Sequence, residues 1–74
     1  MDLKTEKKRT FVYRIGIGIE GMVFKAYYIE AHNWDEARSI GISRFLHPNL
    51  GYNFIDVRRV PKTRENLELV KRDS

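Results

Sequence analysis

The segment from Tyr27 to Arg38 most constrains the fold, because a strand pattern changes there directly into a helix pattern. Apolar residues alternate up to Ala31, as in a strand with one buried face, and helical spacing begins within three residues. Asn33 is a good helix N-cap, and Glu36 stands where it can complete a capping box. The segment therefore predicts a strand that leads, without a long loop, into a capped helix.

The rest of the chain supplies two more strands and a shorter helix. A strand of alternating apolar residues precedes a Glu20-Gly21 turn, in which glycine can adopt positive φ. The segment from His47 to Gly51 predicts the end of the helix and a loop, since proline disfavours a helical residue before it. Gly41 inside the helix indicates that the helix packs closely against the sheet. The predicted elements are strands over residues 11–19, 22–31 and 52–60, a helix over residues 34–46, and a short helix after Pro61 that begins at Thr63.

This order predicts an α+β fold of ββαβ type. A hairpin followed by a helical crossover returns the third strand beside the first, which gives a three-stranded antiparallel sheet of order 2-1-3 with one helix packed on one face. The expected organisation is a flexible basic arm (residues 1–10), a ββαβ domain (residues 11–60) and a basic C-terminal segment (residues 61–74) that forms a short helix.

Composition limits the classes of function. The chain of 74 residues carries a net charge of +4, with basic residues crowded near both ends, which favours polyanionic partners. Without cysteine, neither disulfides nor thiolate metal sites can form, and a reducing cytoplasm is the expected location. We expect no membrane span, because no apolar run is long enough to cross a bilayer.

The second face of the sheet carries most of the functional content. The helix should cover the side that bears Val23, Ile29, Ala31, Ile55 and Val57. On the uncovered side, Gly16 and Gly18 should leave bare backbone in the central strand. The other side chains expected on that side are Val12, Arg14, Phe24, Ala26, Tyr28, Phe54, Asp56 and Arg58.

Two kinds of function fit this face. The first is a nucleic-acid or ribonucleoprotein-binding module, with aromatic rings that stack on bases and cations that hold phosphates. Its candidate residues are Arg14, Phe24, Tyr28, Phe54, Arg58, Arg59, Lys62, Lys7, Lys8 and Arg9. The second is a protein-interaction module, for example a phage or mobile-element accessory protein, in which the face or an edge strand binds a partner or a second copy. The C-terminal segment is a further candidate to cover the face.

Catalysis is not expected. The two histidines, His32 and His47, lie beside helix ends, and no further ligands accompany His32 and Glu36 to form a metal site. The run from Gly16 to Gly21 looks like a dinucleotide fingerprint, but no helix follows it. We therefore expect no enzyme activity, metal, cofactor or small-molecule substrate.

The pattern resembles a known family of small domains. Three segments carry the resemblance: residues 11–15, residues 31–37 and residues 54–57. Together they resemble in outline the ββαβ domain of the ribosomal protein LX family, with a Tyr-Arg first strand, a second strand ending in alanine and an acidic helix start. The resemblance implies contact with ribosomal RNA through basic loops and ends.

Overall fold

The computed structural model describes residues 9–74, so most of the predicted arm, including Lys7 and Lys8, lies outside the described residues. The elements are β1 (Phe11–Ile19), β2 (Met22–Ala31), α1 (Trp34–Phe45), the 3-10 helix η2 (Pro48–Leu50), β3 (Phe54–Val60) and α2 (Arg64–Asp73). In the described part of the chain, no helix has both the length and the apolar character needed to span a membrane.

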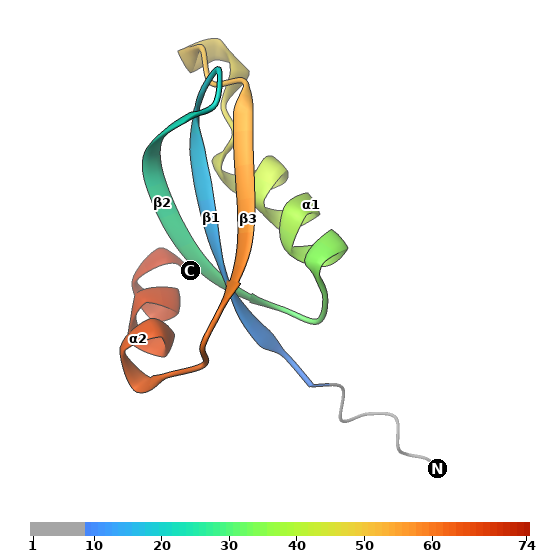
Figure 1. Cartoon of the computed structure of the whole chain (residues 1–74), viewed down its shortest axis with the longest axis vertical. Helices are drawn as coiled ribbons and strands as arrows, with labels where there is room; N and C mark the ends of the chain where they lie inside the picture. Colours follow the sequence, from blue (N-terminus) through green and yellow to red (C-terminus); the bar gives the residue numbers. More distant parts are fainter. Residues whose placement is uncertain (1–8) are drawn as a thin grey trace.

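The predicted α+β fold is confirmed. The three strands form one antiparallel sheet of order β2-β1-β3, with α1 and α2 on opposite sides (Figure 1). β3 begins at Phe54 rather than at Tyr52. Asn53, the residue before it, links this segment to β1 and to the hairpin turn. Its backbone N–H donates to the Gly18 carbonyl (3.1 Å), and its side-chain Oδ1 accepts from the Glu20 N–H (2.9 Å).

α1 covers one face of the sheet and makes the main core with it. The buried side chains there come from alternate positions of β1 and β2 and from one turn of α1: Tyr13, Ile15, Ile17, Ile29, Ala31 and Ala37. Gly41 allows the close approach that the sequence predicts, since a Cβ placed on it would lie 2.8 Å from Ile15 Cγ2 and 3.1 Å from Ile55 Cδ1. Ile29 and Val57 lie on this side, as expected.

Asn33 caps the start of α1 as predicted. The Asn33 side chain accepts from the Glu36 N–H (2.8 Å), while the Glu36 carboxylate accepts from the His32 N–H. Trp34, the first residue of α1, is 49% exposed and does not pack fully into the core. Its Nε1–H donates to the Val57 carbonyl (3.2 Å), which satisfies a backbone group of β3.

The β1–β2 hairpin contains an irregularity that the alternation does not reveal. Glu20 (φ 47°) and Gly21 (φ 88°) form a two-residue turn with positive φ at both positions. The register then shifts between Ile17 and Gly18, because Gly18 pairs with Val23 and leaves Phe24 without a partner in β1. This bulge reverses the face of the residues before it, so the predicted placement of Val23 on the α1 side is wrong.

α2 covers the lower part of the second face. Thr63 caps it as predicted, because its side-chain oxygen accepts from the Asn66 N–H (3.1 Å). The helix packs against β2 and, less extensively, against β1, and Val12 of β1 is fully buried on that side. The half-buried Asp73 accepts a hydrogen bond from the Tyr28 N–H (2.8 Å) and ties the end of α2 to β2.

Candidate nucleic-acid interface

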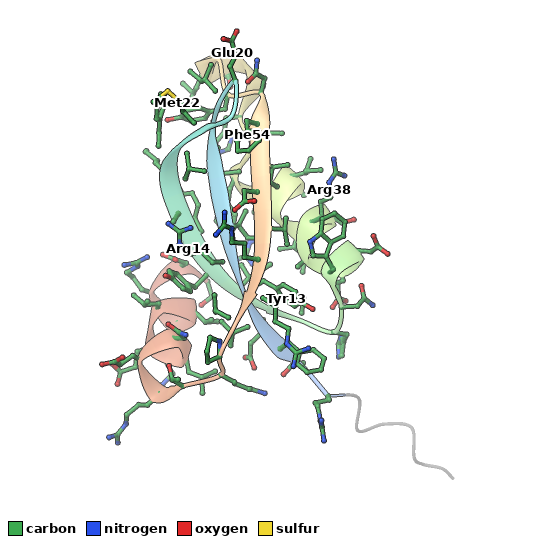
Figure 2. The ribbon with its side chains drawn as sticks, in the orientation of Figure 1. Tyr13, Arg14, Glu20, Met22, Arg38 and Phe54 are labelled. Carbon is green, nitrogen blue, oxygen red and sulfur yellow. The ribbon has the colours of Figure 1, made fainter. Side chains whose placement is uncertain are left out.

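A row of three side chains crosses the second face above α2. In the strand register, Arg14 of β1 stands directly opposite Tyr28 of β2 and Arg58 of β3. Figure 2 shows Arg14 and its sequence neighbour Tyr13 on opposite sides of the sheet. We call Tyr28, Arg14 and Arg58 the arginine row. The sequence predicts all three as site residues, and the fold brings them together.

The arginine row brings two like charges face to face. Residues directly opposite in an antiparallel pair have Cβ atoms about 4.5–5.5 Å apart, and like charges at such positions are destabilising. The exposed Arg58 is partly neutralised by Asp56, since its Nε lies 2.8 Å from an Asp56 carboxylate oxygen. The half-buried Arg14 forms no ion pair with any residue between 9 and 74. The row therefore keeps a net positive charge.

A third arginine joins the Tyr28 end of the row. Arg72 of α2 binds the Asp73 carboxylate through Nε (2.8 Å) and through a second guanidinium nitrogen (3.0 Å). This hydrogen bond lowers the pKa of Asp73, and the bond from the Tyr28 N–H acts in the same direction, while burial opposes both. Sequence reasoning missed Arg72 as a site residue. The sequence signal that could have identified Arg72 is its neighbour Asp73, an aspartate on the apolar side of the predicted helix, where it can reach the sheet.

The predicted strip of bare backbone is not present. A Cβ on Gly16 would lie 3.0 Å from both methyl carbons of Val23, so that side chain covers Gly16. A Cβ on Gly18 would lie 1.6 Å from the Met22 carbonyl oxygen, so the β2 backbone itself crosses over Gly18. Both glycines are buried, and neither offers an open surface to a ligand.

The predicted aromatic residues are spread along the second face. Tyr28 is half-buried beside α2, and Phe54 is half-buried opposite Gly18, toward the hairpin turn. Phe24 lies in the bulge near the turn and is exposed. Only Tyr28 therefore belongs to the arginine row.

The remaining predicted cations lie away from the row. Arg59 pairs with Tyr13 and stacks its guanidinium over the Phe11 ring (3.9 Å), on the α1 side of the sheet. Lys62 donates to the Thr10 carbonyl (3.2 Å) and lies 3.4 Å from a carboxylate oxygen of Glu30. Arg9 is exposed at the start of the described residues, and Lys7 and Lys8 lie outside them.

Comparison with known proteins adds no assignment to this geometry. Within residues 9–74 there is no cluster of three or more side chains of the kinds that hold a metal ion. No family model, no curated protein and no solved structure matches the chain. The resemblance to the ribosomal protein LX family therefore stays a prediction.

Proposed function

We propose that the protein is a small, non-catalytic module that binds single-stranded nucleic acid across its second sheet face. Arg14 and Arg58 of the arginine row contact the phosphates, with Arg72 beside them on α2. The observation that carries the proposal is the direct pairing of Arg14 with Arg58 at the centre of a sheet face, where Arg14 has no ion-pair partner among residues 9–74.

The charge arrangement supports an anionic ligand. A phosphate between two guanidinium groups relieves their repulsion and accepts charge-assisted hydrogen bonds from both. Arginine is suited to this role because its planar donors match the geometry of phosphate oxygens. The ion pair of Arg58 with Asp56 is exposed and therefore weak, so a ligand can replace it at little cost.

The surrounding rings favour a single strand over a duplex. Tyr28 belongs to the arginine row, and Phe54 lies on the same face. Bases stack on such rings at about 1–3 kcal/mol each. An open sheet face accepts splayed bases, whereas a duplex keeps its bases stacked inside. Such a ligand implies a cytoplasmic location. The basic residues at the chain ends, including Arg59 and Lys62, add long-range attraction rather than base contacts.

The test is the affinity for a fluorescent single-stranded RNA of about a dozen nucleotides, measured by anisotropy over a range of salt concentrations. Arg14→Gln should weaken binding about tenfold and reduce the slope of log affinity against log salt by roughly one. Arg38→Gln is the matched control. Arg38 is exposed on α1, and its substitution makes the same change in net charge on the other side of the sheet.

The two variants give clear alternatives. An affinity that falls for Arg14→Gln, and changes less than about twofold for Arg38→Gln, supports the second face as the binding surface. Equal losses for both variants would mean that net charge alone is responsible. Absence of binding at low salt would refute the proposal outright, since electrostatic attraction is strongest there.

A further inference from the structure

We infer that the hairpin end of the sheet is an interface between two copies of this chain, which meet about a two-fold axis. Four of the five large hydrophobic side chains that are exposed in the described residues gather there: Met22 (64%), Val23 (40%), Phe24 (54%) and Leu50 (61%). Contiguous apolar side chains on a small protein mark an interaction site more often than scattered ones do.

The patch belongs to a fixed part of the structure. The turn is held to the segment before β3 by the bond from the Glu20 N–H to Asn53, and that segment is held to β1 by the bond from the Asn53 N–H to Gly18. Figure 2 shows Met22 and Phe54 close to the turn, with Glu20 at its tip. A preformed surface loses little conformational entropy when it binds, which favours association.

Neither α1 nor α2 covers this end of the sheet. α2 is bound at the opposite end of the second face, where Asp73 holds the Tyr28 N–H, and α1 lies on the other face (Figure 1). The short helix η2, which carries Leu50, lies beside the hairpin turn and extends the apolar surface. Within residues 9–74, no element buries Met22 or Phe24.

The charges around the patch identify the occupant as a second copy. Glu20 and Lys25 stand at the two ends of the apolar run, both exposed, and neither forms an ion pair with the described residues. In a two-fold arrangement with the two runs antiparallel, Glu20 of each copy faces Lys25 of the other. The patch is thus complementary to itself in charge as well as in apolar character.

Side chains make this contact, rather than pairing of strand edges. The bulge between Ile17 and Gly18 distorts β2 in this region, and bulges of this kind prevent a regular ladder with another strand. The inference does not rest on nucleic-acid binding, because its residues differ from those of the arginine row.

The experiment is sedimentation equilibrium of the full chain over a wide range of concentration. Wild type should form a dimer, and Phe24→Ser should reduce the association constant at least about tenfold, as expected for an aromatic residue at the centre of an interface. Leu69→Ser, a change of similar size in α2, serves as a control for nonspecific loss of apolar surface. Circular dichroism confirms that each variant is folded.

Charge exchange tests the two-fold arrangement itself. Glu20→Lys and Lys25→Glu should each weaken self-association, because each places like charges opposite one another twice. A mixture of the two variants should restore a dimer that contains one copy of each, and the double variant should dimerise as wild type does. A monomer at all concentrations would overturn the inference, as would a dimer that Phe24→Ser leaves intact or one indifferent to charge exchange.

Discussion

Replacement of Gly41 by alanine tests how closely α1 packs on the sheet. In an exposed helix interior the change stabilises by about 1 kcal/mol, because alanine has the higher helix propensity. At Gly41 the new methyl carbon would lie 2.8 Å from Ile15 Cγ2. That atom is bonded to Cβ of a fully buried side chain and cannot rotate away. Overpacking of this kind costs about 1–3 kcal/mol, and we place this contact near the upper end.

The two effects leave a net loss of about 1–2 kcal/mol in the free energy of unfolding. For a domain of this size, each kilocalorie per mole lowers Tm by about 4–8 °C, which thermal unfolding followed by circular dichroism resolves easily. Ser43→Ala, at an exposed position of α1, is the control and should stabilise by about 0.5 kcal/mol. In a double-mutant cycle with Ile15→Ala, the added methyl should compensate part of the cavity. A Gly41→Ala protein as stable as wild type would refute the close packing.

Three further predictions test other parts of the structure. Gly18→Ala should destabilise the protein by about 3 kcal/mol or more, because its methyl group would meet the Met22 carbonyl. Gly16→Ala should change the stability by less than about 1 kcal/mol. Urea unfolding of the two variants compares these effects. Thr63→Ala should cost α2 about 1 kcal/mol, seen as faster amide exchange in residues 64–73 with little change in Tm, because no α2 residue is fully buried. The pKa of Asp73 is lowered from 3.8, so its contribution to the docking of α2 is complete at neutral pH and is lost as pH falls through the lowered value. Asp73→Asn should remove that acid dependence, measured by the exchange rate of the Tyr28 amide.

The elements of this fold were predictable because their signals are local. Asn33 and Thr63 act as caps through atoms only three residues away, and alternation in residues 11–19 reports one buried face. Gly41 carried a signal as well, since a glycine inside a helix is costly unless another element approaches closely. The strand order followed from the hairpin and the helical crossover.

The face of Val23 was predicted wrongly, because the unpaired Phe24 reverses the faces of the residues between it and the turn. The sequence held one signal of the bulge: Gly18 in the interior of a strand, a position where glycine often marks a bulge or a close backbone approach. Alternation alone gave both sides of β2 an apolar character and could not place the shift.

The role of α2 depends on tertiary contacts. Asp73 and Arg72 read as ordinary charged residues near a chain end, and the bond that the Tyr28 N–H donates to Asp73 forms only because α2 packs against β2. Likewise, the pairing of Arg14 with Arg58 depends on the register between β1 and β3, which the sequence pattern leaves unspecified.

Chemical-shift mapping of the full chain during titration with a single-stranded oligonucleotide is the most direct test of the proposed interface. The largest shifts should occur at the amides of Tyr28, Arg14 and Arg58 and at the guanidinium of Arg72, with α1 nearly unchanged. Shifts concentrated on α1 and the region of Arg38, with the second sheet face unaffected, would contradict the proposal.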